Sequence, residues 1–166
     1  NEDFTEADEI LLSSLENLGI GEVVMVAPEG PHAGGGGLFQ VMNGLLAAFS
    51  QKNILTTLIT PIYEYGQGNK HKSFETILSE GVKFHDKHLS VHYVGEVDIP
   101  FGPTCRVGSG EWVQHRHSVS SQVYIAEDRN IRLVFPRNRR YADYLYPKRS
   151  SDEELRRAIF LSRGAL

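Results

Sequence analysis

The chain is poor in the residues that would tie it to a disulfide framework, a zinc finger or a membrane. Cys105 is the one cysteine among 166 residues, so an intramolecular disulfide is excluded and a reducing compartment is expected. The apolar runs all end before the ~18 residues that a membrane span requires. The formal net charge of -4 leaves no basic excess for general nucleic-acid binding. The first residues are acidic, unlike a signal peptide, so we expect a cytoplasmic protein, or a plastid stromal one in a plant.

The length suits one domain, and both ends of the sequence look cut. The chain begins at Asn1 without a methionine and stops at Leu166, inside a helical pattern that no glycine or proline ends. We therefore expect residues 1–166 to be a single domain fragment that is truncated at its C-terminal end.

A strand, a glycine loop, a helix and a second strand follow one another early in the chain. Residues 23–27 are a continuous apolar run, which is typical of a strand buried on both faces of a parallel sheet. Apolar residues then recur at helical spacing from Leu38 to Phe49. Residues 54–60 are a second strand rich in β-branched side chains, so a right-handed βαβ unit is expected. An amphipathic helix is expected before it, over residues 5–18.

The middle of the chain changes to short strand patterns after a helix that Ser73 can cap. The strand patterns cover residues 82–84, 89–94, 119–125 and 131–135. Two arrangements stay open from sequence: these strands extend the same sheet, or residues 82–135 form a β-rich insertion with its own hairpin. A last helix begins near Ser151. The sequence therefore predicts an α/β, Rossmann-like three-layer domain with a mainly parallel sheet.

The loop after the first strand carries four consecutive glycines, Gly34 to Gly37, directly before the helix. A helix N-terminus presents backbone N–H groups that its own turns do not satisfy, and its dipole favours an anion there. Glycine lets a phosphate approach the backbone closely, and ligands of open α/β sheets bind beyond the carboxyl ends of the strands. We therefore predict an anion site at this loop. A flexible turn without a ligand is the alternative.

Two common nucleotide fingerprints fail at this loop. A P-loop requires Gly-Lys-Ser/Thr, but Leu38 and Phe39 follow Gly37. The dinucleotide fingerprint lacks its third glycine, and Ile59-Thr60 followed by proline stands where an acid would hold a ribose. Dehydrogenases and kinases of these classes are therefore disfavoured.

The start of the chain resembles the opening of the bacterial glycogen synthases and plant starch synthases. The family's first strand leads into a proline, then Lys-Thr/Val-Gly-Gly-Leu, then a helix, and residues 23–27, Pro31 and the run 36–38 are similar to it. The second strand with Pro61 and Tyr63 resembles the family's next strand and its Pro-x-Tyr.

The end of the chain matches the same family in the same order. After Tyr144, residues 157–166 read RAIFLSRGAL, which is similar to the family's Arg-Phe-x-Phe-Phe-Ser-Arg-Ala-Ala-Leu helix, while residues 65–140 match only loosely. The resemblance implies the N-terminal portion of a two-domain GT-B glucosyltransferase. Such an enzyme transfers glucose from ADP-glucose or UDP-glucose to an α-1,4-glucan acceptor with retention, without a metal or other cofactor. The missing C-terminal domain would carry most nucleotide contacts, so the fragment alone is expected to hold no catalytic residue and to be inactive.

The resemblance also implies which residues face the donor. The donor-binding candidates are Gly34, Gly35, Gly36, Gly37 and Leu38, with His32, Gln40 and Tyr63 as further ones. The family's loop lysine falls on Gly34, which removes a charge-assisted contact worth about 1.5–3 kcal/mol. A protonated His32 would replace part of that charge. The alternative is a non-catalytic domain of the same fold that binds a nucleotide sugar or a glucan.

A local basic and aromatic cluster follows the last strand pattern. It consists of Arg137, Arg139, Arg140, Tyr141 and Tyr144. Such a cluster can contact an anionic ligand or a glucan, and an exposed loop without a ligand is the alternative.

Overall fold

This computed structural model describes residues 10, 13–14, 19, 21–32, 36–64, 72–101, 105–106, 112–113, 117–142 and 151–165. Most of the predicted helix over residues 5–18 lies outside this set, as do Gly34, Gly35 and Tyr144.

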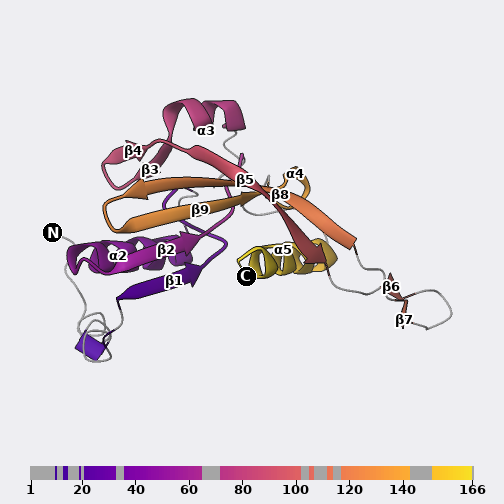
Figure 1. Ribbon diagram of the computed structural model, residues 1–166, viewed down its shortest axis with the longest axis horizontal. Coiled ribbons are helices and arrows are strands. Elements are labelled where there is room, and N and C mark those ends of the chain that lie inside the picture. The colour runs from indigo at the N-terminus through magenta and orange to yellow at the C-terminus, as the bar shows by residue number, and fades with distance from the viewer. Residues whose placement is uncertain are drawn as a thin grey trace.

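A five-stranded sheet in the order β1-β2-β9-β8-β5 forms the centre of the fold (Figure 1). β1 (Glu22–Val26), β2 (Leu55–Ile59) and β9 (Ile131–Arg137) pair in parallel. β8 (His117–Asp128) runs antiparallel to both of its neighbours, β9 and β5 (His92–Phe101). Every strand of this sheet except β8 therefore points the same way, which confirms an α/β domain with a mainly parallel sheet.

The three longest strands of the middle of the chain, β5, β8 and β9, extend this sheet. β8 and β9 form a hairpin whose turn carries Arg129 at a φ of 53°. β5 pairs with β8 and contains an irregularity between Tyr93 and Gly95. Two small antiparallel pairs stand apart from the main sheet: β3 (Val82–Phe84) with β4 (Lys87–Leu89), and β6 (Cys105–Arg106) with β7 (Trp112–Val113).

Four helices complete the described structure: α2 (Gly37–Gln51), α3 (Phe74–Glu80), α4 (Arg139–Ala142) and α5 (Ser151–Gly164). The predicted cap of α3 is confirmed, because the Ser73 hydroxyl accepts a hydrogen bond from Thr76 N at 3.2 Å. Within the described part of the chain, no helix has both the length and the apolarity that crossing a membrane demands.

The helices lie on both faces of the sheet. α2 and α3 pack on the face that carries Leu58 and Tyr124, where the main core lies. α5 packs Phe160 against Ile99 and Val119. Val119 is five residues from Tyr124 along β8, and side chains alternate along a strand, so the two lie on opposite faces. The sheet is therefore a middle layer between α2 with α3 and α5.

β1 is an edge strand, so the prediction that it is buried on both faces is wrong. Val23 and Met25 pack toward α2, but Val24 and Val26 on the other face are 58% and 46% exposed. Among the described strands, only β2 pairs with β1.

The apolar face predicted for α2 is buried only in its later half. Leu46 and Phe49 belong to the core, whereas Leu38 and Val41 in the first turns are exposed. The exposed turns lie at the end of α2 that follows the glycine loop.

Asn130 fastens the far end of α2 to the β8–β9 hairpin. Its Nδ2 donates hydrogen bonds to Phe49 O at 3.2 Å and to Ile54 O at 2.6 Å. Thr56 N in turn donates to the backbone carbonyl of Asn130 at 2.8 Å. The βαβ unit and the hairpin are thereby held together at the end of the sheet opposite the glycine loop.

Candidate functional site

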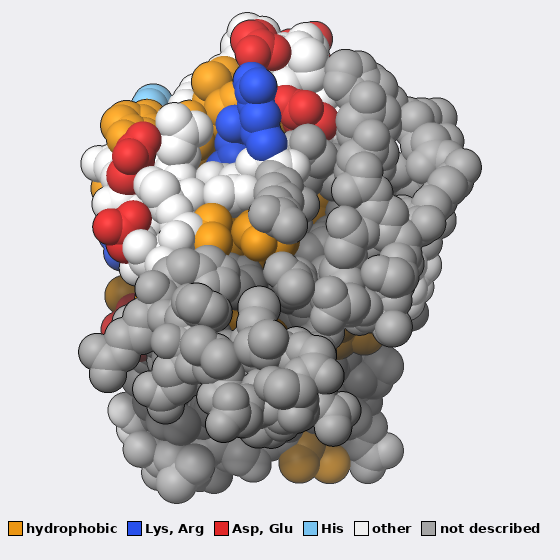
Figure 2. Space-filling model, turned by 90° about the vertical axis from the view of Figure 1, so that its right-hand side faces the viewer, with side chains coloured by type: hydrophobic (Ala, Val, Ile, Leu, Met, Phe, Trp, Pro, Cys, Tyr) orange, Lys and Arg blue, Asp and Glu red, His pale blue; other side chains and the backbone are white. Residues whose placement is uncertain are grey.

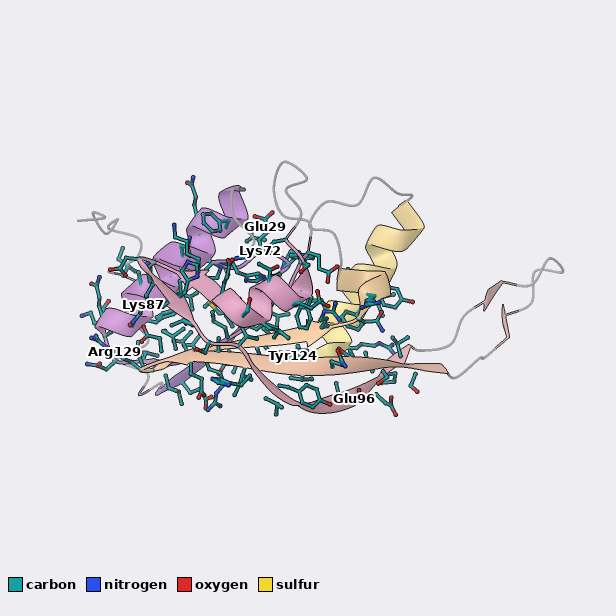
Figure 3. The ribbon with its side chains drawn as sticks, turned by 90° about the horizontal axis from the view of Figure 1, so that it is seen from above. Glu29, Lys72, Lys87, Glu96, Tyr124 and Arg129 are labelled. Atoms are coloured by element: carbon teal, nitrogen blue, oxygen red, sulfur yellow. The ribbon has the colours of Figure 1, made fainter. Side chains whose placement is uncertain are left out.

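The segments after β1, β2 and β9 meet at one rim of the sheet, because parallel strands end at the same edge. Residues 27–32 follow β1, residues 60–64 follow β2, and β9 ends at Arg137. Figure 3 shows Glu29 at this rim, close to one end of α2. Ligands of open α/β sheets bind at this edge, which makes its residues the candidate functional site.

The start of α2 lies at this rim. Gly36 is the N-cap, with extended backbone, and it supplies no side-chain cap. The N–H groups of Gly37 and Leu38 have no acceptor inside the helix, as at any helix N-terminus. A side chain at Gly37 would meet no atom within 4 Å. The described part of the tetraglycine stretch therefore lies at the start of α2, with room for a methyl group at Gly37.

The next amide of α2 already holds an anionic group. Phe39 N donates a hydrogen bond to Oε2 of Glu29 at 3.1 Å, and the Glu29 side chain is buried. A carboxylate thus lies where the helix dipole favours negative charge. The sequence analysis missed Glu29, because it is ten residues from Phe39 across the glycine loop and follows no capping-box spacing.

His32 belongs to the wall of the rim and carries no charge at neutral pH. Burial lowers the pKa of its ring to about 4, and a hydrogen bond with the Pro61 carbonyl opposes this shift without offsetting it. That bond, from Nε2 to Pro61 O at 2.8 Å, assigns the ring proton to Nε2. Nδ1 is then a buried acceptor with no partner among the described residues. A neutral His32 does not supply the partial replacement of the family's lysine charge that a protonated ring would give.

Gly30 packs closely against His32 and Thr60. A Cβ at Gly30 would lie 2.9 Å from Thr60 Cγ2, 3.2 Å from Thr60 Oγ1 and 3.4 Å from His32 Cε1. Thr60 is fully buried, and its Oγ1 has no hydrogen-bond partner in the described part of the chain. The Thr60 and His32 side chains therefore enclose Gly30, the residue after Glu29.

The other two candidates have different places at this rim. The Tyr63 hydroxyl donates to Pro28 O at 2.6 Å, and its ring stacks near His32 with centroids 6.4 Å apart. Tyr63 is buried and links the segment after β2 to the segment after β1, so it positions the loop. Gln40 is exposed on the first turn of α2, and its N–H donates to Gly36 O.

No known protein was found to be similar to this chain. Comparisons with protein-family models, with curated proteins and with solved structures find no match. The structure brings Gly36, Gly37 and Leu38 together at the rim, whereas Gly34 and Gly35 lie outside the described residues.

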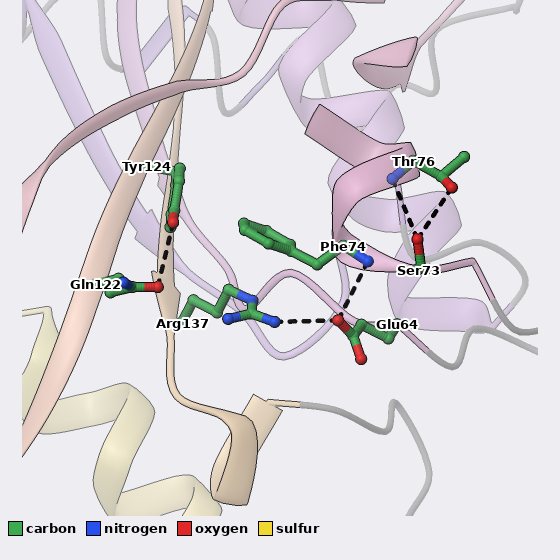
Figure 4. A network of polar contacts seen from close by, with 7 residues as sticks. All are labelled: Glu64, Ser73, Phe74, Thr76, Gln122, Tyr124 and Arg137. Atoms are coloured by element: carbon green, nitrogen blue, oxygen red, sulfur yellow. Dashed lines mark hydrogen bonds and ion pairs between the residues drawn. The ribbon is translucent and has the colours of Figure 1, made fainter. Parts of the chain in front are cut away.

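A largely buried ion pair fixes the next segment of the same rim (Figure 4). Arg137 Nη2 donates to Glu64 Oε1 at 3.0 Å, and Phe74 N donates to the same oxygen at 3.1 Å. The Arg137 guanidinium also lies 3.7 Å from the centroid of the Phe74 ring. Glu64 therefore joins the end of β9 to the start of α3.

Two members of the predicted basic and aromatic cluster, Arg137 and Tyr141, are buried. Arg137 is buried in the ion pair with Glu64, and buried Tyr141 stacks on Phe160 with centroids 5.4 Å apart. Arg139 is exposed, and Tyr144 lies outside the described residues. Only Arg139 can thus offer an unburied cation from the described side chains of this group.

Charge elsewhere on the surface is mixed. On the face in Figure 2, the described Lys and Arg side chains lie beside Asp and Glu side chains. No group of three His, Cys, Asp or Glu side chains in the described ranges is arranged to hold a metal ion.

Proposed function

We propose that this chain supplies the N-terminal, donor-binding side of a retaining α-glucan synthase with a Rossmann-like, GT-B architecture. The observation that carries the proposal is the start of α2, where Gly36 and Gly37 open a 15-residue helix at the carboxyl end of three parallel strands. In the family that the sequence resembles, the equivalent Gly-Gly-Leu faces the glucose and phosphates of the donor. The protein would act in the cytoplasm, or in the plastid stroma of a plant.

In this proposal the chain binds and orients the donor, and a second domain supplies the charged groups at the transferred phosphate. The amides of Gly37 and Leu38 donate to the diphosphate of ADP-glucose or UDP-glucose, and the helix dipole adds partial positive charge. Tyr63 and His32 hold the preceding loop against the segment after β2. The α-1,4-glucan acceptor is extended in the cleft between the two domains.

The test compares two glycines of α2 that have equal room for a methyl group. A Cβ at Gly37 or at Gly44 meets no atom within 4 Å, so neither alanine variant should strain the fold. Donor binding is measured by calorimetry and by backbone NMR with ADP-glucose, UDP-glucose and maltooligosaccharides. We expect a donor to shift the amides of residues 36–39, and Gly37→Ala to weaken donor binding about tenfold, the value of one charge-assisted hydrogen bond. Gly44→Ala should bind as the wild type does. Failure of both donors to bind, or equal binding by the two variants, would contradict the proposal.

A non-catalytic module that binds a nucleotide sugar or a glucan is the second candidate. It is favoured by the lack of loop charge: glycine replaces lysine at position 34, His32 is neutral at neutral pH, and Arg137 is paired with Glu64. Gly34→Lys in the full-length gene product separates the two candidates. A weakened enzyme should transfer glucose faster with the restored charge, whereas a binding module should show no transfer with or without it.

A further inference from the structure

We propose that β1 is the interface through which two copies of this chain associate, by antiparallel pairing about a two-fold axis at Val24. β1 is the outermost strand of the main sheet on the side of α2 (Figure 1), and β2 is its only partner among the described strands. Pairing of two such edges joins the two five-stranded sheets into one continuous sheet.

The backbone of β1 presents a row of hydrogen-bonding groups along its outer edge. Ala27 N donates to Ile59 O at 3.0 Å, and Gly21 O accepts from Leu55 N at 3.2 Å. These two residues therefore point their backbone groups toward β2, and the direction alternates from one residue to the next along a strand. The N–H and C=O groups that point away from β2, where no described strand pairs with them, belong to Glu22, Val24 and Val26.

A two-fold axis at Val24 brings these groups of two copies into register without a clash of charge. Val24 then lies opposite Val24 of the second copy, and Glu22 lies opposite Val26. Outward-pointing residues that face each other in an antiparallel pair exchange both of their backbone hydrogen bonds. On the other face of the strand, Val23 lies opposite Met25. The one charged side chain of β1 thus faces a valine and not its own copy, so no like charges oppose each other.

Exposed apolar side chains gather around this edge on both faces of the sheet. The two exposed valines of β1 lie on the face away from α2, beside Leu55 of β2, which is 41% exposed. On the other face, Leu45 of α2 packs in the same cluster as Val23. Val41 is one helical turn before Leu45 and 54% exposed, so it lies on the flank of α2 nearest the open edge. Apolar side chains that gather on a surface mark sites of protein association.

The other edge strand of the main sheet, β5, carries features that oppose such pairing. Its pairing with β8 contains an irregularity, and Pro100 has no N–H to donate. A two-fold axis at Val97 would place Glu96 opposite Asp98 of the second copy, so their carboxylates would repel each other. Charges, proline and bulges are the features by which proteins protect exposed strand edges. Residues 23–26 of β1 have none of them, which makes β1 the edge that fits a second copy.

The experiment measures association of the whole chain by analytical ultracentrifugation. Concentrations run from about 1 μM to about 1 mM, which spans weak and moderate affinities. Val24→Lys places two ammonium groups opposite each other at the axis, whereas Val97→Lys makes the same change of charge at an exposed valine of β5. We expect the wild type and Val97→Lys to dimerise alike, and Val24→Lys to raise the dissociation constant at least about tenfold.

Mixed variants test the axis itself. Val24→Glu should dissociate as Val24→Lys does, but an equal mixture of the two should form a heterodimer at least about tenfold tighter than either variant alone, because a lysine then faces a glutamate. Recovery on mixing also shows that both variants are folded. Should either variant not fold, Val24→Thr replaces it: it keeps the shape of valine, removes the apolar contact and should raise the dissociation constant at least about threefold.

A wild-type chain that stays monomeric up to about 1 mM would overturn the inference and would indicate that another part of the chain, or a different protein, covers this edge. A dimer that Val24→Lys and Val97→Lys weaken equally, or that both leave intact, would locate the contact elsewhere and overturn it too. Folded variants that fail to recover the dimer on mixing would refute the two-fold axis at Val24, and unchanged affinity of a folded Val24→Thr would refute the role of its side chain.

Discussion

Removal of the Arg137 guanidinium should destabilise the fold far more than removal of an exposed arginine from the same strand. Arg137 is 9% exposed and Glu64 19% exposed, and they pair at 3.0 Å. Breaking a fully buried pair costs about 3–5 kcal/mol, and an exposed pair is worth about 0–1 kcal/mol. The cation–π contact with Phe74 adds up to ~2 kcal/mol. Because Glu64 keeps its hydrogen bond from Phe74 N, we expect Arg137→Met to lower the free energy of unfolding by about 2–3 kcal/mol.

The assay is urea denaturation followed by circular dichroism, with a double-mutant cycle. Arg137→Met, Glu64→Gln and the double variant should give a coupling energy of about 1–2 kcal/mol. Arg132 is the matched control, since it lies on the same strand β9 and pairs with Glu127 at 2.6 Å, but the two side chains are 50% and 49% exposed. Arg132→Met should cost less than about 0.5 kcal/mol. If Arg132→Met costs as much as Arg137→Met, or if the coupling is zero, burial does not set the strength of these pairs and the reasoning fails.

Three further predictions concern single residues. Asn130→Ala removes the donor to Phe49 O and Ile54 O and should lower the free energy of unfolding by about 2 kcal/mol. A loss under about 0.5 kcal/mol in urea titration would show that these hydrogen bonds do not stabilise the fold. Gly30→Ala places a methyl group 2.9 Å from Thr60 Cγ2 and should lower the free energy of unfolding by about 1–3 kcal/mol. The second change Thr60→Ser removes Cγ2 and should restore part of that stability. Gly44→Ala, measured in the same thermal melts, should leave the stability unchanged or raise it. His32 has a pKa of about 4 when folded and 6.5 as its ordinary value, so the unfolded chain binds the extra proton first and stability should fall as the pH drops from 6.5 towards 4. The loss amounts to about 3 kcal/mol at most, and the urea midpoints of His32→Gln should depend less steeply on pH than those of the wild type; equal slopes would refute this assignment.

The parts of the fold that could be predicted are those whose signals are local. Ser73 precedes an apolar helical face and caps α3 as its type and spacing indicate. The polar run 127–130 turns β8 into β9, and the β-branched run before Thr60 pairs in parallel with the first strand. In each case the residues that decide the structure lie within one turn or one strand of each other.

The parts that could not be predicted depend on partners far away in the sequence. Arg137 looked exposed because Arg139 and Arg140 follow it closely, while its partner Glu64 is 73 residues away. The exposure of Val24 depends on the order of strands in the sheet, which an apolar run does not encode. Glycine and strand order predicted that α2 starts beyond the carboxyl ends of parallel strands, as it does. The contact of Glu29 and the neutral state of His32 follow from loop packing, for which the sequence carries no periodic signal.

The contacts of Asn130 have a consequence for the order in which the chain can mature during synthesis. The end of α2 and the start of β2 take their side-chain partner from a residue that leaves the ribosome about 80 residues later. β2 likewise has β9 as its second neighbour, so one of its edges stays unpaired until residues 131–134 emerge. The βαβ unit is thus synthesised early, but its contacts are completed only when residues 130–134 have emerged. A nascent chain that pauses before Asn130 carries an unpaired edge of β2, which chaperones or neighbouring nascent chains can reach.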